Sequence, residues 1–139
     1  MANTVKKILV FGSETGTGDD AALQIAVALD SWARQNGVVF ERCDDPAHVF
    51  FLLEEQKSVV ILDAAAGISE PVLLDGLDSL KCSQAKCSLH DFDAQWFLKL
   101  FESLHPGEKP EIKIVAVPLG CGAKNEIVEK TRKLLEKTG

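Results

Sequence analysis

The stretch SVVIL at residues 58–62 is the clearest structural signal in this sequence. A short, continuous apolar run rich in β-branched residues is typical of a strand that is buried on both faces of a parallel sheet. Two similar runs occur elsewhere, KKILVF at residues 6–11 and EIKIVAV at residues 111–117, and Pro118 ends the second of them. The sequence therefore predicts three core strands of one sheet.

Helical patterns separate these strands. The predicted helices span residues 19–35, 46–56, 91–104 and 123–137. The first has apolar residues at every third or fourth position and is stopped by Asn36-Gly37. In the third, the apolar residues fall on or near one face, namely Phe92, Trp96, Phe97, Leu100 and Leu104. Two more strands are predicted at residues 38–42 and 70–77, and Pro71 favours a sheet edge for the latter because proline cannot donate a main-chain hydrogen bond.

The alternation of strands and helices determines the predicted fold class. It indicates βαβ units, whose crossover helices cover both faces of a mostly parallel sheet. We therefore predict an α/β protein, a three-layer α/β/α sandwich with a mostly parallel, about five-stranded sheet. The length of 139 residues suits one compact domain over residues 1–139 and is too short for two separate cores.

Charge and composition exclude several classes of function. The chain has 21 acidic and 15 basic residues and a formal net charge of -6, so it lacks the basic surplus that binds nucleic acids or anionic membranes. No apolar run approaches the roughly 20 residues that cross a bilayer. The amino-terminal segment leads directly into a predicted strand and has no apolar core of a secretory signal, so we expect a cytoplasmic protein. The 4 cysteines are then expected to be reduced thiols.

Candidate site residues lie where predicted strands end, because ligands of such sheets bind at the carboxyl ends of the strands. Asp63 follows SVVIL directly, Asp19 and Asp20 begin the first helix, and His90 lies at the start of the third. Each has a structural alternative: a turn or cap for Asp63, the helix dipole for the acidic pair, and a polar surface position for His90. Together, two carboxylates and an imidazole can hold a first-row metal and leave positions open for substrate.

The loop after the first strand supports a different function. Gly12, Gly16 and Gly18 precede a helix N-terminus, which binds anions readily. Residues 11–18, FGSETGTG, resemble the phosphate loop of flavodoxins, although the spacing matches neither GxGxxG nor the P-loop pattern. This resemblance implies an FMN-binding electron-transfer domain as an alternative. It weakens at residues 63–67, DAAAG, which offer no serine, threonine or aromatic residue for a flavin.

A second resemblance covers most of the chain, from Lys7 to Leu135. Its motifs are a strand with a glycine-containing loop, Gly18-Asp19-Asp20 opening a helix, an apolar strand ending in Asp63, SLHDF at residues 88–92 opening another helix, and a last strand ending in Pro118. In these motifs the sequence resembles the hydrogenase maturation proteases. These endopeptidases trim the C-terminal tail of the large subunit of nickel–iron hydrogenases.

This resemblance implies a function and a set of site residues. The family's ligands fall on Asp20, Asp63 and His90, which become the expected catalytic and metal-binding residues. The implied activity is a metal-dependent peptidase that removes the C-terminal peptide of a nickel-loaded large-subunit precursor, its expected partner. The cluster would sense nickel carried by that substrate or hold another divalent metal. A metal there could polarise the scissile carbonyl or activate water.

The sequence departs from the family pattern in three places. Residues 13–14, SE, replace the usual Gly-Asn of the first loop, and residues 21–23, AAL, replace Gly-x-Gly after the acidic pair. Cys43-Asp44-Asp45 stands where the family has an Asp-Gly-Gly segment associated with substrate recognition. A catalytically silent scaffold of the same fold is therefore a third alternative, and the sequence does not identify which hydrogenase would be the substrate.

Overall fold

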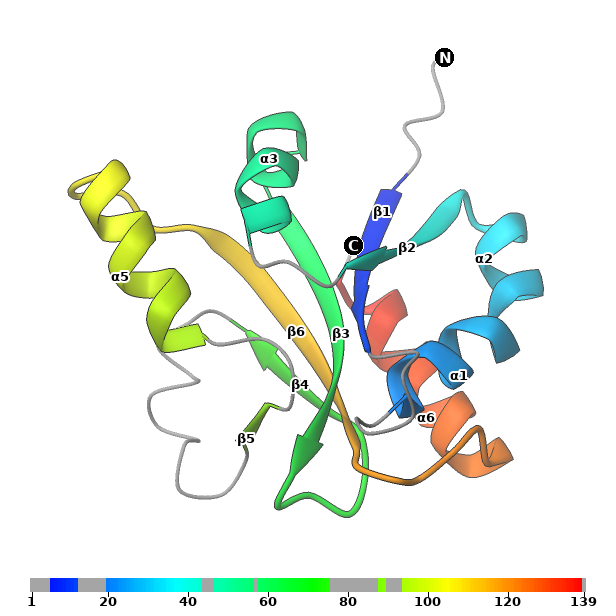
Figure 1. The fold of residues 1–139 in the computed structure, drawn as a ribbon. Helices are drawn as coiled ribbons and strands as arrows, with labels where there is room; N and C mark the ends of the chain where they lie inside the picture. Colours follow the sequence, from blue (N-terminus) through cyan, green and yellow to red (C-terminus); the bar gives the residue numbers. More distant parts are fainter. Residues whose placement is uncertain are drawn as a thin grey trace.

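The computed structural model describes residues 6–12, 20–43, 47–56, 58–75, 88–89 and 94–138. Figure 1 shows a twisted sheet with helices on both of its sides. The strands are β1 (Lys6–Phe11), β2 (Val38–Cys43), β3 (Ser58–Ala66), β4 (Val72–Asp75), β5 (Ser88–Leu89) and β6 (Glu111–Pro118). The helices are α1 (Ala21–Ala28), α2 (Asp30–Gln35), α3 (Ala47–Gln56), α5 (Ala94–Leu104) and α6 (Asn125–Glu136).

The strand order of the sheet is β2-β1-β3-β6-β4, and β5 pairs with β3 outside this path. Strands β2, β1, β3 and β6 are parallel, whereas β4 is antiparallel to β6 and lies at the edge beyond it. The mostly parallel sheet is thus confirmed, as is the edge position of the strand after Pro71. The chain passes from β1 to β2 on one side and then to β3 on the other, so the strand order reverses between β1 and β3.

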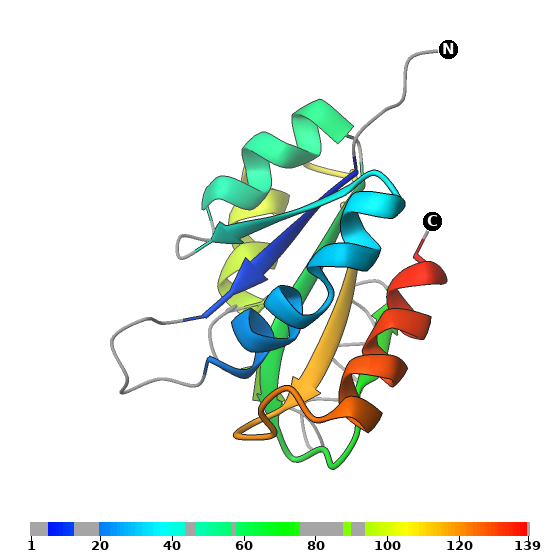
Figure 2. The ribbon, with the colours of Figure 1, turned by 90° about the vertical axis from the view of Figure 1, so that its right-hand side faces the viewer.

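Two helical layers cover the sheet, and each has its own apolar core. Helices α3 and α5 lie on one face, and α1, α2 and α6 lie on the other (Figure 2). Neighbouring residues of a strand serve opposite faces. In β1, Leu9 and Phe11 belong to the core under α3 and α5, whereas Ile8 and Val10 belong to the core under α1 and α6. The predicted three-layer α/β/α sandwich is confirmed.

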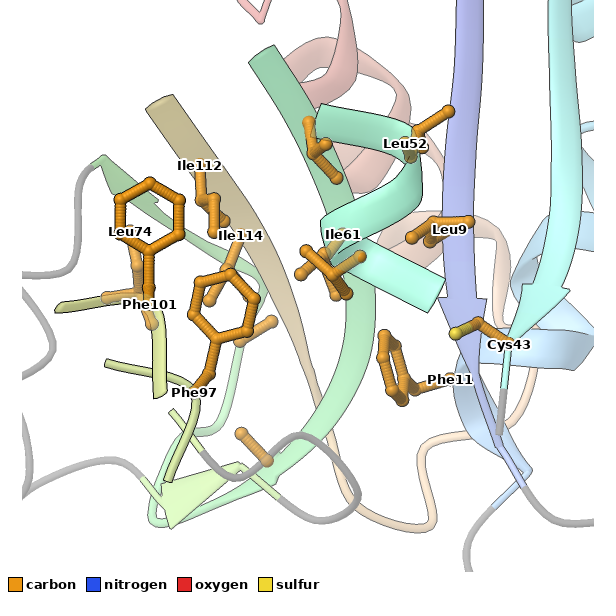
Figure 3. Packing of buried hydrophobic residues seen from close by; sticks show 14 residues of the cluster. Leu9, Phe11, Cys43, Leu52, Ile61, Leu74, Phe97, Phe101, Ile112 and Ile114 are labelled. Carbon is orange, nitrogen blue, oxygen red and sulfur yellow. The ribbon is translucent and has the colours of Figure 1, made fainter. Parts of the chain in front are cut away.

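Aromatic side chains fill the core under α3 and α5 (Figure 3). Phe97 is 0% exposed, and its ring stacks on Phe50 of α3 with a centroid distance of 4.6 Å. Phe101, one turn later, stacks on the same ring at 6.2 Å. The sequence places Trp96 and Leu104 on or near the same face as Phe97, but these two residues are 45% and 59% exposed. The helix is rotated to direct Phe97 and Phe101 at α3, which turns Trp96 by about 100° away from that contact.

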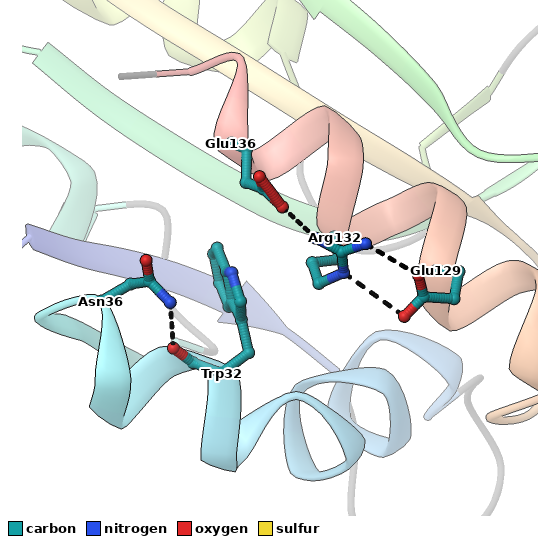
Figure 4. A network of polar contacts seen from close by, with 5 residues as sticks. All are labelled: Trp32, Asn36, Glu129, Arg132 and Glu136. Carbon is teal, nitrogen blue, oxygen red and sulfur yellow. Dashed lines mark hydrogen bonds and ion pairs between the residues drawn. The ribbon is translucent and has the colours of Figure 1, made fainter.

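The first predicted helix is divided in two by a bend at Leu29, between α1 and α2. Leu29 has φ -95° and ψ 10°, and its side chain is buried. The bend keeps this side chain in the core while α2 turns to pack along β2. At the end of α2, the Asn36 side chain donates a hydrogen bond to the carbonyl oxygen of Trp32 at 2.7 Å (Figure 4). Gly37 follows with φ 66°, which confirms the predicted stop.

Apart from β5, which was expected to be loop, the other described strands and helices agree with the predicted elements to within a few residues, with one consequence for the site. Strand β3 continues past Leu62 to Ala66, so the prediction that Asp63 lies directly after the strand is wrong. The extension forms because Ala65 pairs with Pro118 of β6 on one side and with Leu89 of β5 on the other.

Some predictions fall outside the described residues. They concern the glycine-containing loop at residues 13–19, the Cys43-Asp44-Asp45 segment after Cys43, the loop at residues 76–87, and residues 90–93 with His90. The extent of a single domain over residues 1–139 also stays a prediction. In the described ranges, the helices are all too short or too polar to span a bilayer.

Candidate functional site

The reversal of strand order between β1 and β3 marks the place where a sheet of this kind binds its ligand. Two strands pair with the edge of β3 that faces β1, and each forms a hydrogen-bonded ladder with it. Strand β1 pairs with Val60–Leu62, and β5 pairs with Ala65 and Ala66. Asp63 and Ala64 lie between the two ladders, at the carboxyl end of the sheet. The sheet therefore places one acidic residue at its reversal point.

Asp63 is fully buried. Its residue is 0% exposed, and by the alternation of the strand it shares a face with Ile61 and Ala65, which belong to the core under α3 and α5. The Oδ1 atom accepts a hydrogen bond from the main-chain N–H of Ala64 at 2.9 Å. A fully buried carboxylate is rare in proteins, and this one lies at the reversal point of the sheet, which makes Asp63 the strongest functional candidate in the described chain.

Asp20 lies directly before α1 and is exposed. It occupies the N-cap position, but its side chain makes no capping hydrogen bond to the first turn. Instead, its Oδ1 atom accepts a hydrogen bond from Nε2 of Gln24 at 3.0 Å. Asp20 therefore does not cap α1 through a side-chain hydrogen bond, and Asp19 lies outside the described residues.

A close contact between β1 and α1 fixes where α1 begins. Gly12 follows β1 directly, and a Cβ atom there would lie 2.7 Å from Cγ and 2.8 Å from Cδ1 of Leu23. Only glycine allows this approach without a shift of the leucine side chain. The contact holds the first turn of α1, and with it Asp20, close to the carboxyl end of β1.

His90 lies outside the described residues, but the residue before it does not. Leu89 pairs with Ala65, two positions after Asp63 in β3. The described residues alone contain no group of three histidine, cysteine or acidic side chains that could hold a metal. The cluster of Asp20, Asp63 and His90 accordingly stays a prediction.

A groove of about 790 Å³ runs beside Asp20, between the helices α1 and α2 and strand β2. Asp20, Leu23 and Gln24 lie along its α1 side, and Phe40 and Arg42 lie along β2. Sequence reasoning missed Gln24. Its spacing of four residues from Asp20 was the available signal, because side chains at this spacing meet on a helix surface.

Comparisons with known proteins agree with this architecture. No family model matches the sequence, and no curated protein matches it. Among solved structures, the nickel–iron hydrogenase maturation protease HybD from Thermococcus kodakarensis matches 96% of this chain and 98% of its own chain, with a TM-score of 0.59 and 20% sequence identity. The two proteins share a fold over nearly their whole lengths. The resemblance seen in the sequence motifs is thus confirmed at the level of the fold.

Proposed function

We propose that this protein is an endopeptidase that removes the C-terminal peptide of the large-subunit precursor of a nickel–iron hydrogenase. One observation supports this most strongly: a fully buried carboxylate, Asp63, lies at the reversal point of a sheet whose fold matches a hydrogenase maturation protease. Fully buried aspartates are rare in proteins, and sheets of this kind bind their ligands at such a reversal point.

The proposed site consists of Asp20, Asp63 and His90, which would bind the nickel of the substrate or another divalent metal. Carboxylate oxygens and a neutral imidazole nitrogen are suitable ligands for first-row metals, and three ligands leave positions open. The described residues fit this role. Asp63 and Asp20 both present carboxylate oxygens, and Asp20 is not engaged in capping its helix. Leu89, the residue before His90, pairs with Ala65, two positions after Asp63 in β3.

The carboxylates of Asp63 and Asp20 differ in their exposure to solvent, and this difference suggests that they have different roles. Asp63 is enclosed by the core, so its position is fixed. Asp20 faces solvent at the end of a groove, where a large substrate can reach it. A divalent metal bound between them would polarise the scissile carbonyl or activate water.

The test is a cleavage assay on every large-subunit precursor from the organism that makes this protein. Each precursor is prepared with and without nickel, and the new C-terminus is identified by mass spectrometry. We expect one nickel-loaded precursor to lose its C-terminal peptide and its nickel-free form to stay uncut. Cleavage of both forms would reject nickel sensing but keep the peptidase. Failure to cut any nickel-loaded precursor would reject the proposed activity.

A further inference from the structure

We propose that Gln24 is a positioning residue that orients the Asp20 carboxylate for its ligand. The role rests on the metal site of the proposed function. It goes beyond that function because neither the motifs nor the fold comparison point to Gln24, whose neighbours in the sequence depart from the family pattern.

The first observation concerns what the Asp20 side chain does not do. An aspartate at the N-cap position typically accepts a hydrogen bond from the second or third main-chain N–H of the helix. Asp20 has φ -100° and ψ 16°, outside the extended region that such caps adopt, and makes no capping bond. Its carboxylate is therefore not held by the first turn of α1.

The second observation is that Gln24 holds the Asp20 carboxylate instead. The main-chain N–H of Gln24 donates to the carbonyl oxygen of Asp20 at 3.0 Å, and Nε2 of Gln24 donates to Oδ1 of Asp20 at 3.0 Å. A carboxylate only accepts, so the NH2 group of the amide must face it. The amide oxygen Oε1 then faces the loop after β6, where a Cβ on Gly122 would lie 3.5 Å away. Gln24 thus lies between Asp20 and a second loop at the carboxyl end of the sheet.

These contacts have a consequence for a ligand of Asp20. Among the described residues, the bond from Gln24 is the one hydrogen bond to this carboxylate, so the Oδ2 atom remains available, and Asp20 itself lines the groove. A carboxylate held by such a partner does not have to lose rotamer freedom when it binds a metal. Loss of a comparable partner weakens metal binding by about 10–100-fold in known sites.

The test compares Gln24→Met with the parent protein. Methionine keeps the length and helix propensity of glutamine but cannot donate a hydrogen bond. The first readout needs no metal: three-bond couplings report the χ1 rotamer of Asp20. We expect one rotamer in the parent and averaging over several in Gln24→Met. Gln35→Met, an exposed substitution at the end of α2, is the matched control and should leave Asp20 unchanged.

The second readout is titration with nickel(II) chloride, followed by the paramagnetic broadening of amide signals near Asp20 and Asp63. We expect Gln24→Met to raise the dissociation constant by at least about tenfold. In an Asp20→Ala background, the same substitution should have no further effect, because Gln24 acts through Asp20.

Three results would overturn the proposal. They are an unchanged Asp20 rotamer in Gln24→Met, an equal loss of nickel affinity in the Asp20→Ala background, and an absence of nickel binding in the parent. The first two reject the role of Gln24 and leave the proposed peptidase intact. The third rejects the metal site as well. Nickel binding that depends on Gln24, combined with no cleavage of any precursor, would instead reject the peptidase and keep the positioning role.

Discussion

Asp63 is the residue on which the functional interpretation depends most. Sequence alone allowed a turn or cap, because the residue was expected directly after a strand. The structure instead places it inside β3, 0% exposed, between the ladder to β1 and the ladder to β5. Its Oδ1 atom accepts a hydrogen bond from the main-chain N–H of Ala64, which also lies between the two ladders. A structural contribution and a ligand role are therefore both compatible with its position, and a substitution can separate them.

Asp63→Asn separates the two roles. Asparagine keeps an oxygen that can accept from Ala64 but loses the negative charge, so we expect the fold to persist and thermal unfolding to change little. Precursor cleavage should fall by at least about tenfold, since even indirect partners of metal ligands have effects of this size. Glu55→Gln, which removes an exposed carboxylate paired with Lys7, is the control and should cleave at the parental rate. Full activity of Asp63→Asn would remove Asp63 from the site.

Gly12 provides a test of the contact that places α1. In Gly12→Ala, the new Cβ would collide with Leu23, whose Cγ lies 2.7 Å from its position. We expect the free energy of unfolding to fall by about 1–3 kcal/mol, as in other overpacked sites, measured by urea denaturation. The double variant Gly12→Ala/Leu23→Ala should recover part of the loss. If the losses of unfolding free energy in the two single variants instead simply add in the double variant, the steric contact is not the cause.

At the scale of elements, helix α5 packs on the core through the rings of Phe97 and Phe101, which stack on Phe50 of α3. Phe97 is 0% exposed and contacts Phe50, whereas its neighbour Trp96 is 45% exposed. We expect Phe97→Ala to cost about 3–5 kcal/mol of unfolding free energy and Trp96→Ala to cost roughly 1 kcal/mol. Urea denaturation of both variants measures the difference. A larger loss for Trp96→Ala would mean that the helix is rotated the other way.

Helix α6 carries an exposed ion-pair network in which Arg132 contacts Glu129 at 2.8 Å and also pairs with Glu136 (Figure 4). The hydrogen bond from Arg132 lowers the pKa of Glu129 below its ordinary value. A carboxylate with a lowered folded-state pKa contributes stability above its unfolded pKa, and this contribution disappears as the pH falls through the folded value.

Arg132→Met should therefore be slightly less stable than the parent at pH 7. The difference should vanish on acidification to below the lowered pKa of Glu129, and it should shrink in high salt because exposed pairs are screened. Thermal unfolding of both proteins across this pH range measures the effect. A difference that persists in acid would instead point to lost packing of the arginine stem.

At the scale of the whole molecule, the strands that are covered on both faces of the sheet were the most predictable part of the fold. The apolar runs of β1, β3 and β6 predict a parallel sheet between two helical layers, and the structure confirms this arrangement. The rotation of α5 was not predictable, because Trp96 and Phe97 are both apolar and only the rings of α3 decide which is buried. The extension of β3 was not predictable either, since Ala64 and Ala65 have low strand propensity and depend on β5 and β6 as partners.

The candidate site was predictable only in part. The motifs identified Asp20 and Asp63, and the structure places both at the carboxyl end of the sheet. The burial of Asp63 and the contact between Asp20 and Gln24 depend on tertiary structure and on side-chain direction, which spacing alone does not give. The position of His90 relative to both carboxylates stays a prediction.

The convergence of Asp20, Asp63 and His90 on one ion is tested most directly by a crystal structure of the protein soaked in nickel chloride, with anomalous data collected at the nickel edge. We expect a single peak at the reversal point between β1 and β3, bonded at about 2.0–2.2 Å to an oxygen of each carboxylate and to a nitrogen of His90. A His90 side chain more than about 10 Å from both carboxylates, far beyond any ligand bond, would contradict the proposed site, as would a nickel peak bound elsewhere.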